Sequence, residues 1–398
     1  MKPFIIVLFA LVFCFCRQPQ VASKPLSQVA EEKPIVTGAE KITDWLHLVE
    51  GKKVGVLANH TAMVGQLHLV DTLLKSGVQV VRIFVPEHGF RGDADAGELI
   101  KDGTDAVTGI PIVSLYGNNK KPTIEQLKGI DILIFDIQDV GVRFYTYISS
   151  LHYLMEACAE NNLPIIVLDR PNPNGDYFDG PVLKPEFKSF VGMHPIPVVH
   201  GLTVGELSLI INGEGWLEGQ RQCDLTVVEM GNYTKNRIYS LPIPPSPNLP
   251  NDMAIRLYPS LCLFEATKVS IGRGTYFPFQ VIGFPDSTFG DFSFTPKSIQ
   301  GMAKNPLQED IACFGEDLRG LSPFDQSFTL KYFIKYFELS GKDKNFTSNR
   351  RWFNLLAGND ALLKQIEAGL SEDEIRATWK NELLEYNLMR QPYLLYKE

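Results

Sequence analysis

Short apolar runs alternate with longer amphipathic segments from about residue 52 to about residue 230. The strand-like runs are KKVGVLAN, QVVRIFV, IPIVSLY, DILIFDI, PIIVLD and DLTVVEM, and the helix-like segments between them include VDTLLKSG, TIEQLKG, YISSLHYLMEACAENN and TVGELSLIINGEG. Runs such as ILIFDI are apolar on both faces, as a strand covered by helices on both sides must be. Strands that alternate with helices form right-handed βαβ units. The pattern therefore predicts an α/β fold with a doubly wound parallel sheet.

A proline-rich stretch separates this pattern from a different one. The stretch LPIPPSPNLPND, residues 241–252, contains five prolines, which exclude a helix and disfavour a central strand. Beyond it, aromatic-rich runs such as TYFPFQVIG and SFTLKYFIKYFELSG precede a helical tail, in which Ser371 and Glu374 have the S-x-x-E form of a helix start. We expect one α/β domain over residues 41–240 and a smaller α+β domain over residues 241–398.

The first forty residues are expected to lie outside both domains. The run from Pro3 to Cys16 has fourteen residues, mostly apolar, which suits a signal peptide and is short of the about 20 residues of a membrane span. We predict a signal peptide over residues 1–20 and a flexible tether over residues 21–40. A lipoprotein signal with Cys14 or Cys16 lipidated and a plain cleaved signal peptide stay open as alternatives, since a phenylalanine precedes each cysteine where a small residue is usual. Either alternative predicts an exported protein, periplasmic or held at the membrane by a lipid anchor.

Composition and charge exclude several classes of function. The 398 residues include 38 Lys and Arg against 46 Asp and Glu, and no basic run, so nucleic acid is a poor partner. The six cysteines show no CxxC pair or zinc-site spacing and are too few for a disulfide scaffold. Neither GxGxxG after the first strand nor GxxxxGK[ST] nor GxSxG occurs, which disfavours a nucleotide cofactor and a serine hydrolase. We therefore expect no cofactor.

Polar and titratable side chains follow four of the predicted strands. In a doubly wound sheet, ligands bind beyond the carboxyl ends of the strands. The candidates are Asn59 and His60 after the first strand, the loop 86–98 after the second, Asp136, Gln138, Asp139 and Arg143 after the fourth, and Asp169, Arg170 and Asn172 after the fifth. Solvation alone does not easily explain four such clusters at one edge of a sheet, so we predict an active site there.

The loop PEHGFRGDADAGE, residues 86–98, is the densest of these clusters. Its candidate side chains are Glu87, His88, Arg91, Asp93, Asp95 and Glu98. Glu87 directly follows an apolar strand, so we expect partial desolvation, which raises the pKa of a carboxyl group and favours a proton donor near neutral pH. The alternative is a solvated acidic loop in which Glu87 pairs with Arg91.

Histidines allow a metal-dependent alternative. His60 and His88 follow strands at the proposed site and could bind a metal with nearby aspartates, whereas His200 in VVHGLT is more often a structural residue. No HExxH or comparable spacing supports a metal site. We do not predict a metal, but a metal-dependent phosphoester or amide hydrolase stays open. A non-catalytic exported sugar-binding protein, with two lobes that close around a cleft, is a further alternative.

A string of long motifs runs along the chain. It comprises NHTA (59–62), PEHGFRGDADAGE (86–98), SLYG (114–117), FDIQDVGVRFYTYI (135–148), LDRPNPNG (168–175), GPVL (180–183), PIPVVHGLTVGEL (195–207), PPSPNLP (244–250), YPSLCLFEAT (258–267), GRGTYFPF (272–279) and RQPYLLY (390–396). In type and order these motifs resemble the NamZ-type exo-β-N-acetylmuramidase family, and the resemblance covers nearly the whole chain beyond the tether.

This resemblance implies a glycoside hydrolase of peptidoglycan turnover that removes N-acetylmuramic acid from the non-reducing end of glycan fragments. It implies a Rossmann-like domain joined to a smaller second domain, an active-site cleft between them, and no nucleotide. By motif position, the catalytic glutamate of the family falls on Glu87. Two positions depart from common family members: Ala266 stands where a glycine is frequent, and Ile271 where many members have a glutamate before GRG.

Glycoside hydrolysis usually needs one carboxylic acid and a second carboxylate. We expect Glu87 to be the acid, positioned by His88 or Arg91, and Asp136 to be the second carboxylate because it also comes first after a strand. The other carboxylates considered for the second role are Asp95, Glu98, Asp139 and Glu265.

Selection of N-acetylmuramic acid requires recognition of its lactyl carboxylate, which N-acetylglucosamine lacks. A bidentate arginine suits this purpose, and the candidates are Arg143 and Arg273, followed by Arg170, although each could instead pair with an aspartate of the protein. The aromatic candidates for stacking against a sugar are Tyr145, Tyr147 and Tyr276.

Overall fold

The computed structural model describes residues 33–87, 89–90 and 102–397. The predicted signal peptide, most of the predicted tether, and the candidates His88, Arg91, Asp93, Asp95 and Glu98 lie outside the described residues. The described residues from Ile35 onward belong to a single compact unit.

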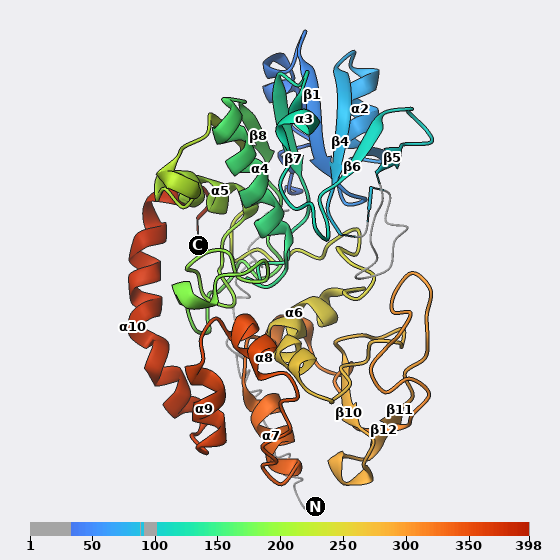
Figure 1. Cartoon of the computed structure of the whole chain (residues 1–398), viewed down its shortest axis with the longest axis vertical. Helices are drawn as coiled ribbons and strands as arrows, with labels where there is room; N and C mark the ends of the chain where they lie inside the picture. Colours follow the sequence, from blue (N-terminus) through green and yellow to red (C-terminus); the bar gives the residue numbers. More distant parts are fainter. Residues whose placement is uncertain (1–32, 88, 91–101, 398) are drawn as a thin grey trace, which may run out of the picture. The chain divides into compact units, whose positions relative to one another are not determined.

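A seven-stranded sheet forms the first part of this unit (Figure 1). Its strands are β1 (Lys53–Ala58), β4 (Gln79–Val85), β5 (Gly103–Thr104), β6 (Pro111–Ser114), β7 (Ile132–Asp136), β8 (Ile165–Leu168) and β9 (Leu225–Val228). Their order is β5-β6-β4-β1-β7-β8-β9, and all neighbours are parallel except β5 and β6. The chain starts at the centre, winds outward to β6, and then winds outward on the other side to β9. This order confirms the predicted doubly wound sheet, and the short antiparallel edge strand β5 is an addition that the pattern did not predict.

Both faces of the sheet are buried, as the two-sided apolar runs predict. In β7, Ile132 and Ile134 belong to one core cluster, and Leu133 and Phe135 belong to the other. The first cluster also takes side chains from α1 (Ile42–Trp45) and α2 (Leu69–Lys75). The second takes side chains from α3 (Ile124–Leu127), α4 (Tyr147–Asn161) and α5 (Val204–Gly213).

Local sequence signals fix the helix ends. Thr123 and Gln126 form a capping box at the start of α3, and Thr203 and Glu206 form another at the start of α5. Asn162 ends α4 in the left-handed conformation with a φ of 53°. The smaller elements of this part are the hairpin of β2 (Met63–Val64) and β3 (Leu67–His68), and the 3₁₀ turns η1 (Leu46–Leu48), η2 (Pro185–Phe187) and η3 (Glu218–Gln220).

The second, smaller part begins after the proline-rich stretch, which forms no helix or strand between β9 and α6. Its three-stranded antiparallel sheet has the order β10-β12-β11, from β10 (Val281–Phe284), β11 (Phe292–Phe294) and β12 (Cys313–Asp317). Its helices are α6 (Asp252–Leu261), η4 (Cys262–Ala266), η5 (Ser287–Phe289), η6 (Pro323–Asp325), α7 (Lys331–Leu339), α8 (Arg350–Ala357), α9 (Ala361–Glu367), α10 (Glu372–Arg390) and η7 (Gln391–Tyr393). The predicted capping box of Ser371 and Glu374 starts α10.

The C-terminal helix returns to the parallel sheet. Figure 1 shows α10 running from α9 towards α5. The Tyr386 hydroxyl on α10 donates a hydrogen bond to the carbonyl oxygen of His200 at 2.5 Å, and the Tyr396 hydroxyl donates one to Asp169 at 2.7 Å. One hydrophobic cluster runs from the parallel sheet to α7 and α8. The two parts therefore share a core. No helix within the described ranges is long and apolar enough to cross a membrane.

Candidate active site

A pocket of about 540 Å³ lies between the parallel sheet and the second part of the chain. From the first part, its lining includes Glu87 and Tyr116, which follow β4 and β6, and residues 144–147, which lead into α4. From the second part, it includes Glu265 in η4 and Arg273 in the turn before β10. The pocket lies at the carboxyl ends of parallel strands, where ligands of doubly wound sheets bind.

Glu87 is half-buried at this pocket, two residues beyond the end of β4. Its Oε1 atom accepts a hydrogen bond from the Tyr116 hydroxyl at 3.1 Å. The two residues meet because β4 and β6 are paired in parallel, with Val85 opposite Ser114. Burial and the nearby Glu87 carboxylate raise the pKa of Tyr116 to about 12, so its hydroxyl remains a hydrogen-bond donor over the working pH range.

Glu265 supplies the second carboxylate of the pocket. One of its oxygens lies 2.6 Å from Nη2 of Arg273, and the guanidinium group of Arg273 also lies over the ring of Phe279 at 5.1 Å. The glycines of the GRG turn make this placement possible. Gly272 has a φ of +79°, and a Cβ atom there would lie 2.9 Å from the carbonyl oxygen of Phe277.

Lys120 is a second cation in the pocket. It follows β6, and its Nζ atom lies 4.4 Å from the centroid of the Phe190 ring, which also lines the pocket. The next residue, Lys121, points to a different place and forms ion pairs with Glu156 and Glu160, both at 2.9 Å. Within the part of the chain that the structure describes, no ion pair is found for Lys120.

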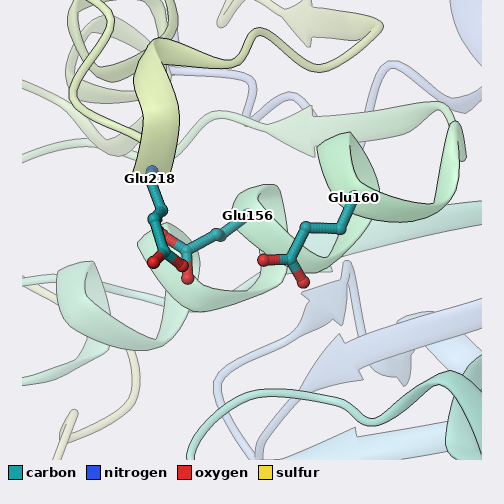
Figure 2. A group of neighbouring side chains, drawn as sticks. All are labelled: Glu156, Glu160 and Glu218. Atoms are coloured by element: carbon teal, nitrogen blue, oxygen red, sulfur yellow. Dashed lines mark hydrogen bonds between the residues drawn. The ribbon is translucent and has the colours of Figure 1, made fainter.

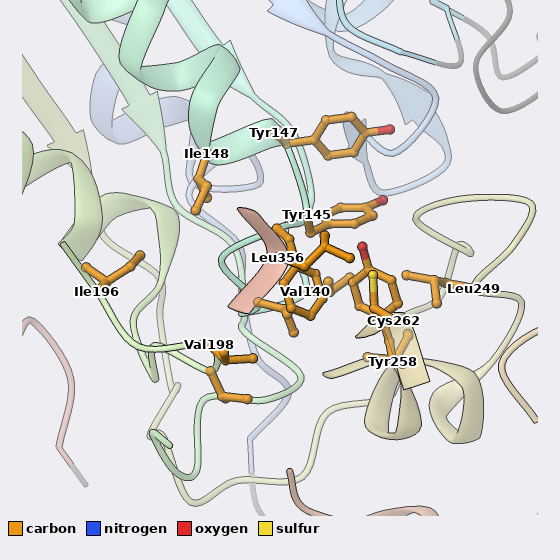
Figure 3. Packing of buried hydrophobic residues seen from close by; sticks show 14 of the residues in the cluster. Val140, Tyr145, Tyr147, Ile148, Ile196, Val198, Leu249, Tyr258, Cys262 and Leu356 are labelled. Carbon is orange, nitrogen blue, oxygen red and sulfur yellow. The ribbon is translucent and has the colours of Figure 1, made fainter. Parts of the chain in front are cut away.

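Aromatic side chains form one wall of the pocket. Tyr145 and Tyr147 pack edge to face with their centroids 4.8 Å apart, and Tyr258 packs in the same way against Phe279 at 5.0 Å. Figure 3 shows Tyr147 next to Tyr145, and Tyr258 beside Leu249; all four line the pocket. The Tyr145 hydroxyl is held by the carbonyl oxygen of Pro245 at 2.8 Å. A wall of this kind suits the apolar face of a sugar ring.

The structure places Asp136 outside the pocket. Its carboxylate is fully buried at the end of β7 and accepts hydrogen bonds from Nε and Nη2 of Arg170, which follows β8. This geometry corrects the expectation that Asp136 is the second catalytic carboxylate, because Asp136 is fully buried against Arg170 and does not line the pocket. Arg170 is already paired with Asp136, so it is no longer a candidate for binding the carboxylate of a substrate.

Arg143 also has a structural role, because its side chain binds the backbone of the protein. It is fully buried, and its guanidinium group donates hydrogen bonds to the carbonyl oxygens of Pro181, Ile196, Leu356 and Ala357 at 2.7 to 2.9 Å. Burial lowers the pKa of Arg143 to about 9. The expectation that Arg143 recognises a substrate carboxylate is corrected, since its donors face the backbone of the protein and it does not line the pocket.

Most other strand-end candidates form hydrogen bonds within the loops that follow the strands. Asn59 accepts a hydrogen bond from Thr61, and Gln138 donates to the carbonyl oxygen of Pro171. Asp139 accepts from the amide of Gly141 at 2.7 Å. These side chains are buried and do not line the pocket, so they shape the strand ends instead of facing a ligand there.

The remaining candidates have similar structural contacts. Asn172 donates to the carbonyl oxygen of Leu202, and Nε2 of His200 lies 3.5 Å from Asp139. Nε2 of His60 lies 2.9 Å from the carbonyl oxygen of Pro244. Asp169 accepts hydrogen bonds from the side chains of Thr203 and Tyr396. None of these lines the pocket.

Among the described residues, only Glu156, Glu160 and Glu218 are grouped closely enough to hold a metal ion (Figure 2). These three do not line the pocket, and Lys121 already pairs with two of them. His60 belongs to no such group within the described ranges. The metal-dependent alternative also needs His88 and nearby aspartates of the loop 86–98, which lie outside the described residues.

Five of the residues that the sequence analysis named as candidates line the pocket: Glu87, Tyr145, Tyr147, Glu265 and Arg273. Sequence reasoning misses Tyr116 and Lys120. Both follow β6, the third predicted strand, and the sequence analysis named no candidate after that strand. Because β6 pairs in parallel with β4, residues after it must lie near Glu87. Application of the strand-end rule to every strand would have found both.

The fold and the pocket define an α/β enzyme with two carboxylates, an aromatic wall and cations at one site. Residues 54–253 match the family model "Exo-beta-N-acetylmuramidase NamZ, N-terminal", and residues 256–396 match its C-terminal counterpart. The chain belongs to the NamZ family of exo-β-N-acetylmuramidases, which confirms the resemblance seen in its motifs.

The chain is similar to its relatives along most of their lengths. The chain is 38% identical over 405 residues to the peptidoglycan β-N-acetylmuramidase NamZ of Bacillus subtilis (strain 168), with 93% of each protein covered. It is similar to the crystal structure of a DUF1343 family protein from Bacteroides fragilis NCTC 9343, with a TM-score of 0.85, 48% identity, and coverage of 92% of this chain and 100% of that one. A second DUF1343 family structure from the same organism has a TM-score of 0.78 at 30% identity and covers 91% of this chain and 99% of that one.

Proposed function

We propose that this chain is an exo-acting glycoside hydrolase that releases N-acetylmuramic acid from the non-reducing end of peptidoglycan fragments, with Glu87 and Glu265 as its two carboxylates. One observation carries the proposal: these carboxylates, from the two parts of the chain, line one pocket. Membership of the NamZ family and the likeness to the Bacillus subtilis enzyme support the substrate and the exo mode of action.

The two carboxylates have different surroundings, as two different roles require. Tyr116 holds Oε1 of Glu87 in place, and the carboxyl group of Glu87 donates a proton to the bridging oxygen of the glycosidic bond. Glu265 lies beside Arg273, which compensates its negative charge. It supplies the carboxylate that assists attack at the anomeric carbon. The leaving sugar takes the proton from Glu87. Water provides the hydroxyl group of the released N-acetylmuramic acid, and its remaining proton returns to the pair of carboxylates, which restores the acid.

The pocket suits a sugar in size and in surface. A volume of about 540 Å³ falls within the range of about 300 to 1,000 Å³ of small-molecule sites. Tyr145, Tyr258 and Trp352 contribute aromatic surface for the C–H faces of the ring, and the charged groups lie among them.

The test is hydrolysis of a chromogenic N-acetylmuramic acid glycoside by the purified protein, with and without a chelator. We expect equal activity in both conditions. Glu87→Gln and Glu265→Gln should each lower kcat/KM by at least about 100-fold while the protein stays folded. Glu160→Gln, a substitution of an exposed carboxylate away from the pocket, is the control and should keep full activity.

Three results would contradict the proposal. Full hydrolysis by Glu87→Gln would remove Glu87 from the mechanism. Loss of activity with the chelator would favour metal-dependent chemistry. Binding of muramic acid fragments without any product would favour the sugar-binding alternative.

We infer in addition that the chain is exported. The apolar run from Pro3 to Cys16 supports a signal peptide, and a peptidoglycan substrate lies outside the cytoplasm. Cell fractionation should find the mature protein in the periplasm or on a membrane. A label from fatty acid that is lost in the Cys14→Ser, Cys16→Ser double variant would indicate a lipoprotein, and full-length protein in the cytoplasm would contradict export.

A further inference from the structure

The charges that line the pocket are not all compensated. The charged side chains among the described lining residues are Glu87, Lys120, Glu265 and Arg273. Arg273 is paired with Glu265 at 2.6 Å, so recognition of a ligand anion by Arg273 would weaken that pair. Lys120 forms no ion pair with any residue in the described part of the chain. It is therefore the cation that a bound anion can use without loss of an existing pair.

The ammonium group of Lys120 is also held in place. It lies 4.4 Å above the ring of Phe190, a cation–π arrangement that orients the amine without neutralising its charge. The ring itself is fixed, because Tyr153 of α4 stacks on it at 6.2 Å and the Ser149 hydroxyl donates a hydrogen bond to the carbonyl oxygen of Phe190 at 2.7 Å. A cation on a fixed support loses little conformational entropy when an anion binds.

This cation meets a chemical requirement of the proposed substrate. N-acetylmuramic acid has a carboxylate on its lactyl ether, and N-acetylglucosamine has no charge at that position. A partly buried ammonium strengthens the interaction with a carboxylate relative to one in bulk water. Lys120 follows β6, next to the strand that places Glu87, so both reach the same bound sugar.

We infer that Lys120 is the residue that determines specificity for N-acetylmuramic acid, by pairing its ammonium group with the lactyl carboxylate of the sugar. The inference rests on the proposed function, because it assigns the recognition of the substrate in the same pocket. It replaces the three arginines that the sequence suggested, two of which are committed to structural contacts and one to Glu265.

The experiment compares Lys120→Met and Lys120→Arg with the wild-type protein on three chromogenic glycosides. These are the glycosides of N-acetylmuramic acid, of its lactyl methyl ester, and of N-acetylglucosamine. Lys120→Met should lower kcat/KM for the acid by about 10- to 100-fold, mostly through KM, as expected for loss of one charge-assisted contact. It should change the two neutral substrates by less than about threefold. Lys120→Arg should recover part of the preference for the acid.

Lys121→Met is the matched control. It removes a neighbouring lysine that pairs with Glu156 and Glu160 away from the pocket, so the ratio between acid and ester should not change. Equal losses on all three substrates with Lys120→Met, or an unchanged preference for the acid, would overturn the inference. If the wild-type protein hydrolyses none of the glycosides, the proposed function fails separately. Calorimetric binding of free N-acetylmuramic acid to wild-type protein and Lys120→Met would then still test Lys120.

Discussion

Glu87 shows how far a single residue can be interpreted from sequence. Its position directly after an apolar strand is sufficient to place it at the sheet edge, and the structure places it in the pocket. Asp136 occupies the same kind of position after β7, yet it is buried against Arg170. The position of a residue after a strand does not reveal whether the neighbouring strand supplies its counter-charge. For this reason sequence reasoning finds the sheet edge at which the pocket lies, but its choice for the second carboxylate, Asp136, lies outside that pocket.

Tyr116 provides a test at the scale of one hydrogen bond. Tyr116→Phe removes the donor to Glu87 and keeps the ring. Because one hydrogen bond to a charged group is worth about 1.5 to 3 kcal/mol, we expect kcat/KM to fall by about 10- to 100-fold. Tyr276→Phe, at an exposed tyrosine outside the pocket lining, is the control and should be neutral. Unchanged kinetics for Tyr116→Phe would show that the hydrogen bond does not position Glu87.

At the scale of elements, the strands and helices that were predicted for the first part are present in the structure. There the hydrophobic periodicity and the helix caps indicate the same elements. The second part was predicted only as α+β, since its aromatic-rich runs fit strands and buried helices equally well. SFTLKYFIKYFELSG in fact contains α7, whereas the strands β10 and β11 come earlier. Helical or extended structure in such runs is decided by tertiary packing, which single-sequence patterns do not contain.

Asp169 links three elements and predicts a pH dependence. It follows β8, it is fully buried, and it accepts hydrogen bonds from Thr203, Gly205 and Tyr396. Burial raises the pKa of Asp169 from 3.8 to about 7. Between about pH 4 and pH 7 the folded state therefore keeps a proton that the unfolded state has lost. The free energy of unfolding should fall as the pH rises through this window, by up to about 4 kcal/mol from this group.

Asp169→Asn cannot ionise, so it should lack this decline. Denaturant unfolding of the variant and the wild-type protein at several pH values between 4 and 7 measures the difference. The free energy of unfolding of the wild-type protein, relative to that of the variant, should fall as the pH rises. Asp310→Asn, at an exposed position, controls for loss of a carboxylate. If the free energy of unfolding depends on pH in the same way for Asp169→Asn and the wild-type protein, Asp169 has the same pKa in the folded and unfolded states, and the prediction is wrong.

At the scale of the whole molecule, the two parts are joined by buried polar contacts as well as by a shared core. Arg143 leaves the parallel-sheet part and donates two hydrogen bonds to the carbonyl oxygens of Leu356 and Ala357 at the end of α8. The pocket needs this junction, because Glu87 and Glu265 come from opposite sides of it. Sequence alone could not indicate the role of Arg143 in this junction, because an arginine that follows a strand could equally contact a substrate or the protein itself.

Arg143→Met tests the junction. The variant fills a similar volume and leaves four carbonyl oxygens without their donor, so we expect the free energy of unfolding to fall by about 3 to 5 kcal/mol. Arg350→Met removes an exposed ion pair with Glu367 and should cost less than about 1 kcal/mol. Denaturant unfolding of both variants provides the comparison. Similar small losses would mean that Arg143 does not hold the two parts together.

The central claim is that Glu87 and Glu265 act on one sugar in one pocket. The most direct measurement is a crystal structure of Glu87→Gln with a disaccharide of N-acetylmuramic acid linked to N-acetylglucosamine. We predict that the muramic acid ring occupies the pocket, with the bridging oxygen about 3 Å from the side chain of residue 87 and with Glu265 close to the anomeric carbon. A disaccharide bound elsewhere, or one in the pocket whose bridging oxygen faces away from residue 87, would contradict the account.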